Sequence, residues 1–324
     1  MSVAASPGAA RAERARAIRR ILWVVLVLNL LVAAAKIGYG VFSGSIAMSA
    51  DGLQSLLDGL ANVVGLVGIA VAARPPDEEH LYGHERYETL ASLVIAALMA
   101  FGVVEIAQGA VGRLRSGAQP EVTALSFVVL VATSLVNAGV SWWERRAGRR
   151  WRSDFLAADA KHTATDVLVS LGVMLGLAGV ALGVTFADAA ISLAIAAVIA
   201  YGAWTIVRDA SLVLTDAIGA DPRVLLAAVL AAPGVVTAHG LRARSTGGRL
   251  WVEVHITVDP DLTVRAAHEI ANRVEQCIQE EAGPRTQVIV HVEPAEPPHT
   301  RPDLLFGDVR EERSESAATG HNGA

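Results

Sequence analysis

The sequence predicts a membrane protein, with an all-α bundle of six transmembrane helices followed by a small C-terminal α+β domain. Apolar residues make up 53% of the 324-residue chain and the mean hydropathy is +0.44, which is too apolar for an ordinary soluble domain. A membrane-spanning helix needs about 20 mostly apolar residues. Six segments meet this length: Ile18–Phe42, Ile46–Ala72, Thr89–Leu114, Val122–Trp142, Phe155–Val184 and Ala187–Val207.

The first span is expected to be retained in the mature chain. The first twenty residues carry five arginines before the long apolar run, as a signal peptide would, but this run continues past signal length without a small-residue cleavage site. The formal charge of -5 gives no reason to expect nucleic acid as a partner. The single cysteine, Cys277, excludes a disulfide framework and a cysteine-based zinc cluster.

Positive charge is distributed unevenly between the two sides of the predicted bundle. The segment 1–17 and the link between the fourth and fifth spans are rich in arginine, whereas Ser43–Ser45 and Thr185–Phe186 are short and uncharged. Arginine and lysine concentrate in cytoplasmic loops. We therefore expect both termini on the cytoplasmic side of the plasma (inner) membrane.

The pattern changes after the sixth span. Two alternating segments, His239–Ser245 and Arg249–Asp259, are joined at Thr246-Gly247-Gly248 and predict a β-hairpin. Helical periodicity at Val224–Leu230 and Val264–Glu281, with a last strand at Thr286–Glu293, completes a small α+β sandwich. The expected organisation is a basic N-terminal segment (1–17), a membrane domain (18–208), an α+β metal-binding domain (209–296) and a disordered tail (297–324).

One motif, Ala-Asp-x-x-(Gln/His)-x-x-x-Asp, occurs at 50–58 and again at 158–166. Positions i, i+3 and i+7 share a helix face, and ionisable groups inside a membrane need partners or a wet cavity. Packed antiparallel, the second and fifth spans would bring four groups to one divalent cation: Gln54, Asp58, His162 and Asp166. The alternatives are a misplaced span boundary or carboxylates paired for packing, and for Gln54 a hydrogen bond rather than a metal bond.

Two further clusters have the composition of metal sites. Asp77, His80 and His84 have helical spacing in the link after the second span, although an ordinary polar loop is the alternative. In the C-terminal domain, histidines and a glutamate lie on the predicted strands and helix: His239, His255, His268, His291 and Glu293.

The ligand types limit the choice of metal. Imidazole with carboxylate suits zinc, iron, cobalt or manganese, and the lack of thiolate argues against copper(I). Zinc is the first expectation, with iron(II), manganese, cobalt and cadmium as alternatives. Because ligands must be deprotonated, metal loading would be coupled to protons.

The chain resembles the cation diffusion facilitator (cation efflux) family from about Ile21 to Pro294. The resemblance is carried by the motifs Ser43-Gly44-Ser45, Tyr82-Gly83-His84 with Arg86 and Glu88, the Asp-x-x-His-x-x-x-Asp of the fifth span, Pro233-Gly234-Val235 with His239 and Leu241-Arg242, and Val288–Pro294.

This resemblance implies a homodimer with six spans per protomer, a ferredoxin-like, metallochaperone-like cytoplasmic domain, and metal export driven by proton entry rather than enzymatic chemistry. It implies that the three clusters are the transport site, a loop site and a cytoplasmic binuclear site that helps hold the dimer, and that Arg86 and Asp216 form a charge pair between the two domains. Two departures from the family are Gln54, where zinc transporters usually have His or Asp, and Lys161, where relatives usually have an apolar residue. Lys161 would either tune the proton affinity of the site or point away from it.

The alternative function is a membrane-anchored metal sensor or scaffold, but such a protein would have no use for carboxylates in mid-membrane. A transporter of organic cations would need an aromatic cage, and only 5% of residues are aromatic.

Overall fold

The computed structural model describes residues 7–43, 46–116, 124–181, 187–300 and 305. Most of the expected tail and the first residues of the basic N-terminal segment lie outside these ranges. The chain divides into two compact units, Met1–Ser211 and Leu212–Ala324.

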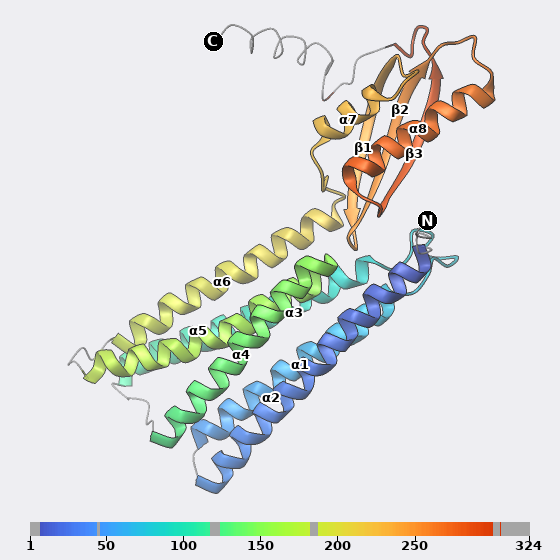
Figure 1. Cartoon of the computed structure of the whole chain (residues 1–324). Helices are drawn as coiled ribbons and strands as arrows, with labels where there is room; N and C mark the ends of the chain where they lie inside the picture. The colour runs from blue at the N-terminus through green and yellow to red at the C-terminus, as the bar shows by residue number, and fades with distance from the viewer. Residues whose placement is uncertain (1–6, 44–45, 117–123, 182–186, 301–304, 306–324) are drawn as a thin grey trace, which may run out of the picture. The chain divides into compact units, whose positions relative to one another are not determined.

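The first unit consists of long helices that lie side by side (Figure 1). Their bounds are α1 Pro7–Ser43, α2 Ile46–Ala72, α3 Arg86–Ser116, α4 Ala124–Trp151, α5 Asp154–Ala181 and α6 Ala187–Leu214. Each expected span overlaps one of these helices. Helices α1 and α4 extend well beyond the expected spans. The polar segments next to these spans are rich in arginine and alanine, which favour the helix as strongly as apolar residues do, so the helix continues through them.

Three of these helices are long and apolar enough to cross a membrane within the described residues: Ala12–Tyr39 of α1, Arg86–Gly112 of α3 and Ala189–Leu214 of α6. The described apolar part of α2 is the shorter segment Asp58–Ala72. Helix α4 ends in a row of arginines, and α5 carries Asp159, Lys161 and Asp166 in its first half. The membrane crossing of α2, α4 and α5 stays a prediction.

Helices α2 and α5 approach each other closely at Gly65. A Cβ at this glycine would lie 2.2 Å from the ring of Phe155, which is fully buried on α5. Helix α3 packs against α2 about one turn further along, where Gly68 faces the methyl group of Ala91. Small residues on α2 thus let the helix that carries Asp58 pack closely against the helix that carries His162.

The second unit is a three-stranded sheet with two helices: α7 Pro222–Ala231, β1 Thr237–Thr246, β2 Arg249–Val258, α8 Val264–Ala282 and β3 Thr286–Pro294. The expected order helix, strand, strand, helix, strand is confirmed. Strands β1 and β2 are antiparallel, and β2 and β3 are parallel and joined through α8. Gly247 and Gly248 make the hairpin turn with φ of 58° and 74°, the positive values that the tightest hairpins require.

Both helices of this unit cover the same face of the sheet. Leu226 of α7 and Val274 of α8 join one apolar core with Val254 and Ile256 of β2. Since successive residues of a strand point to opposite faces, His255 lies on the other face, away from the helices.

Candidate metal sites

The two copies of the repeated motif face each other in antiparallel register. Gly65 lies against Phe155. One turn further along α2, Asn62 Nδ2 donates a hydrogen bond of 2.9 Å to Asp159 Oδ2, and the next turn brings Asp58 to His162. Each step back along α2 corresponds to a step forward along α5, as antiparallel helices require.

Asp58 and His162 have the geometry of two ligands of one metal ion. Asp58 Oδ1 lies 3.4 Å from His162 Nε2, and both side chains are almost enclosed, with exposed fractions of 13% and 11%. Both ring nitrogens of His162 are buried and have no hydrogen-bond partner among the side chains that the structure describes. Metal bonds of about 2.0–2.2 Å place two ligand atoms about 3.3–3.5 Å apart on a tetrahedral ion. A divalent ion between Asp58 and His162 would therefore satisfy a nitrogen that the protein leaves without a partner.

The other two members of the predicted site lie one turn away from Asp58 and His162 on the same two helices. Asp166 follows His162 on α5, is partly buried, and acts electrostatically on His162. Gln54 precedes Asp58 on α2, and its side chain lies outside the described side chains. The register of the two helices puts the backbone of Gln54 at the level of Asp166.

A chain of hydrogen bonds supports this site from the neighbouring helices. Asn29 of α1 donates to Asn62 Oδ1 at 2.8 Å, and Asn62 donates to Asp159, which is 1% exposed. On the other flank, Thr163 Oγ1 donates to Glu144 Oε2 of α4 at 3.2 Å, and Glu144 is fully buried. Sequence analysis missed Glu144 because the expected fourth span ended at Trp142, whereas α4 continues through it to Trp151.

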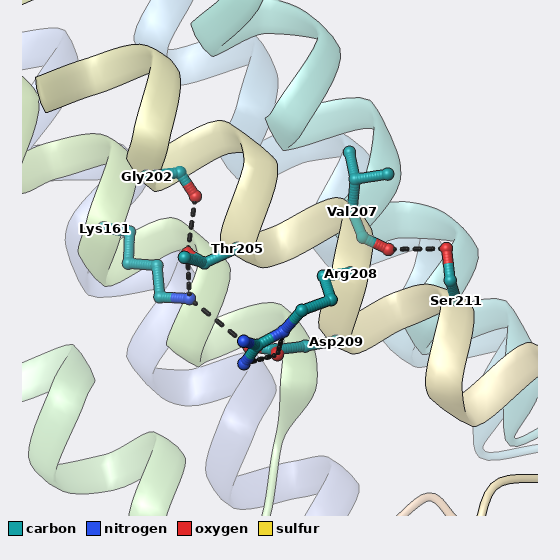
Figure 2. Close-up of polar contacts among 7 residues, drawn as sticks. All are labelled: Lys161, Gly202, Thr205, Val207, Arg208, Asp209 and Ser211. Atoms are coloured by element: carbon teal, nitrogen blue, oxygen red, sulfur yellow. Dashed lines mark hydrogen bonds and ion pairs between the residues drawn. The ribbon is translucent and has the colours of Figure 1, made fainter. Parts of the chain in front are cut away.

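Lys161 makes its contacts with α6. Its Nζ donates to Thr205 Oγ1 at 2.9 Å and lies 3.6 Å from Asp209 Oδ2, as Figure 2 shows. Adjacent residues of a helix do not share a face. Of the two alternatives that the sequence left open, the structure therefore favours a side chain that points away from His162.

The loop between α2 and α3 brings together Asp77, His80 and His84, whose ligand atoms lie within 4.8 Å of one another. Asp77 Oδ1 accepts the backbone N–H of His80 at 2.8 Å and lies 3.2 Å from the Nδ1 of its ring, and Oδ2 lies 3.2 Å from His84 Nε2. Gly83, with φ of 88°, allows the chain to turn so that the buried ring of His84 meets Asp77. The backbone N–H of His80 lowers the pKa of Asp77 against the opposing effect of desolvation, which keeps the carboxylate ionised for a cation.

The third cluster forms a row across the sheet. His239 of β1 pairs with His255 of β2, which pairs with His291 of β3. Residues in register on adjacent strands point to the same face, and Glu293, two residues after His291, shares it. A bulge between His239 and Arg242 puts Gly240 beside the ring of His255, where a Cβ would be 3.5 Å from the ring.

Glu293 lies at the centre of this row. Its Oε1 is 3.2 Å from His255 Nδ1 and 3.4 Å from His291 Nε2, and its Oε2 is 3.2 Å from His239 Nε2. Desolvation raises the pKa of Glu293, but the hydrogen bond from His255 and the charges of the facing imidazoles outweigh it and hold that pKa below its ordinary value. His268 is exposed on α8 and is outside the group of described ligand atoms that approach one another.

The predicted charge pair joins residues of different units. Arg86 is the first residue of α3, and Asp216 belongs to the second unit, where its carboxylate lies 3.6 Å from Arg244. The pair stays a prediction.

Comparisons with known proteins match most of the chain. A family model described as the cation efflux transmembrane domain matches residues 22–215, and one described as the cytoplasmic domain of cation efflux proteins matches residues 221–295. The chain is 30% identical to an uncharacterized transporter of Methanocaldococcus jannaschii over 82% of this chain and 94% of that protein. It is 32% identical to a probable cation efflux system protein of Mycobacterium tuberculosis, over 89% and 87% of the two chains. It is 29% identical to the manganese efflux system protein MneS of Bacillus subtilis, over 84% and 94%.

Proposed function

Because the chain belongs to the cation efflux family, whose members are transporters of divalent metal cations rather than enzymes, we propose that it exports such a cation from the cytoplasm in exchange for protons. Gln54, Asp58, His162 and Asp166 form the transport site, which opens to the two sides of the membrane in turn. The observation that carries the proposal is the contact between Asp58 and His162, whose ring nitrogens are buried and make no hydrogen bond within the described part of the chain.

Exchange for protons follows from the chemistry of the ligands. With His162 neutral, the carboxylates of Asp58 and Asp166 balance the charge of one divalent ion. When the ion leaves, the two carboxylates are left as buried anions beside an imidazole, which is energetically unfavourable. Binding a proton at this site removes that unfavourable charge. His162 is the group whose ordinary pKa lies closest to neutrality, so it is our candidate for the proton carrier.

The substrate is a divalent transition metal. Three oxygen ligands and one imidazole form a harder set than zinc sites usually have; carboxylate and carbonyl oxygens suit manganese, and imidazole suits iron as well as zinc. A relative named for manganese efflux agrees with this set. Manganese, iron(II) and cobalt therefore stand beside zinc and cadmium among the candidate substrates.

The protein works as a homodimer in the plasma membrane, with six spans per protomer and both termini in the cytoplasm. The arginine-rich N-terminal segment and the link between α4 and α5 support this orientation. The cytoplasmic domain binds the same metals at Glu293 and its histidines, and Arg86 with Asp216 links the two domains.

Metal uptake into proteoliposomes, with internal pH recorded, tests the proposal across zinc, iron(II), manganese, cobalt and cadmium. Asp58→Ala is expected to abolish both metal flux and metal-dependent proton movement, since it removes a charged ligand. Lys161→Met is the matched control, because it changes a charged neighbour of His162 whose contacts are with α6. It should retain flux within about fivefold of wild type, since a half-exposed ion pair contributes about 1 kcal/mol or less.

Full flux in Asp58→Ala would move the transport site elsewhere. If wild type moved none of these metals while the cytoplasmic domain still bound them, the membrane-anchored sensor would replace the transporter as our conclusion.

A further inference from the structure

The chain folds back on the sheet after its last strand. Ala295 N–H continues the pairing with β2 by donating to Val258 O at 2.8 Å. The next residues form a turn in which Glu296 N–H donates to Pro294 O and His299 N–H donates to Glu296 O, both at 2.8 Å. This turn returns the ring of His299 to the carboxylate of Glu293.

His299 faces one oxygen of Glu293 together with His239. Its Nδ1 lies 3.4 Å from Glu293 Oε2, and His239 Nε2 lies 3.2 Å from the same oxygen. The other oxygen, Oε1, faces His255 and His291. Each carboxylate oxygen thus has two imidazole nitrogens beside it, although sequence analysis had assigned only three of these four histidines to the cluster.

Hydrogen bonds do not account for the contacts of Oε2. This oxygen is buried and makes no hydrogen bond to any described residue, although two ring nitrogens lie within 3.4 Å of it. Separations of 3.2 and 3.4 Å match the distance of about 3.3–3.5 Å between two ligands of a tetrahedral ion. A metal ion between the three side chains would give the buried oxygen its partner.

We propose that His299 is a metal ligand, which with His239 and Glu293 Oε2 holds one divalent ion, while His255, His291 and Glu293 Oε1 hold another. The proposal rests on the proposed function in that the cytoplasmic domain binds the same metals. His299 lies beyond residues 221–295, the segment that matches the family's cytoplasmic domain. Metal at this site would tie the turn after β3 to the sheet.

The test uses the full-length purified protein in a background of Asp58→Ala and His84→Ala, which removes one ligand from each of the other two candidate sites. Bound cobalt(II) is counted per protomer by mass spectrometry after dialysis, its affinity is measured against a chelator, and its visible absorption reports the coordination geometry. The variants compared are His299→Gln, Glu293→Gln and, as a matched control at the same end of the chain, His321→Gln.

His299→Gln is expected to weaken one of the two bound ions by at least about 100-fold, the upper end of the effect of losing an outer partner of a metal site, and to change the cobalt spectrum. The control should bind both ions as the background protein does. His299→Cys, which replaces the imidazole with another cobalt ligand, should restore the ion with a sulfur-to-metal absorption band. Because the ring of His299 is 38% exposed, its removal should leave the fold intact, which circular dichroism checks.

Unchanged affinity and spectrum in His299→Gln would overturn the assignment of His299. If Glu293→Gln still lost metal in that case, the cytoplasmic site would stand and only His299 would leave it. If Glu293→Gln also bound as the background does, the cytoplasmic cluster itself would be removed from the proposed function.

Discussion

Replacing Arg14 by methionine is expected to destabilise the helical unit by about 3–5 kcal/mol, the usual cost of removing one partner of a buried ion pair. Arg14 lies on α1, and its guanidinium is 2.8 Å from Glu88 Oε2 at the start of α3, with exposed fractions of 10% and 2% for the two side chains. It also donates hydrogen bonds of 2.8 Å to the carbonyl oxygens of Trp151 and Arg152, between α4 and α5. One side chain therefore connects three parts of the bundle.

The size of the effect comes mainly from Glu88. Without Arg14 its buried carboxylate would keep only the hydroxyl of Ser153 as a hydrogen-bond donor among the described contacts. Glu88→Gln removes the charge that needs the guanidinium, so the double variant Arg14→Met/Glu88→Gln should be less destabilised than the sum of the single variants by about 1–3 kcal/mol.

Unfolding in mixed micelles, followed by tryptophan fluorescence, measures these free energies, since α4 carries three of the six tryptophans. Arg16→Met is the control, because Arg16 is exposed on the same helix and its described hydrogen bond goes to the backbone carbonyl oxygen of Ala12, one turn earlier. A loss below about 1 kcal/mol for Arg14→Met, or strict additivity in the double variant, would refute the reasoning that Glu88 depends on Arg14.

Three further changes test other parts of the structure. Metal binding by the cytoplasmic cluster should weaken as the pH falls, because protons compete with the metal for the imidazole nitrogens. The pKa of Glu293 is held below its ordinary value, so its carboxylate stays ionised and its stabilising charge is lost only in more acidic solution than usual. Equilibrium dialysis from pH 8 to about 5 should therefore report only the competition for the imidazole nitrogens. Gly65→Ala should cost about 1–3 kcal/mol in the same unfolding assay, because its Cβ would overlap the buried ring of Phe155, whereas Gly102→Ala, with open space at its Cβ, should not. Asn62→Leu should cost about 1–3 kcal/mol, because a buried carboxylate loses a hydrogen-bond donor.

Periodicity predicted which residues share a face, because it depends only on the local geometry of the helix and the strand. The spacing from Asp159 to Asp166 puts His162 on the same stripe as both carboxylates, and alternation along β3 puts His291 and Glu293 on one face. The hairpin turn at Gly247 and Gly248 was predicted for the same reason, since the turn needs φ values that glycine adopts freely.

Alignment between elements was decided only by tertiary packing. The register that brings Asp58 to His162 depends on the close approach of Gly65 to Phe155, two residues with no motif of their own. The direction of Lys161 was equally open until α6 supplied Thr205. Side chains that pair over long sequence separations leave no local pattern.

The sequence by itself determined the helices, the small sheet, the family and the residue types that suit a divalent metal, because these follow from composition and from spacing within one element. Only the tertiary structure decided that Glu144 is fully buried against α5, that Arg14 reaches Glu88, and that His299 returns to Glu293. Each of these depends on where a turn or a helix end leaves the chain in space, and the packing of the whole unit sets that position.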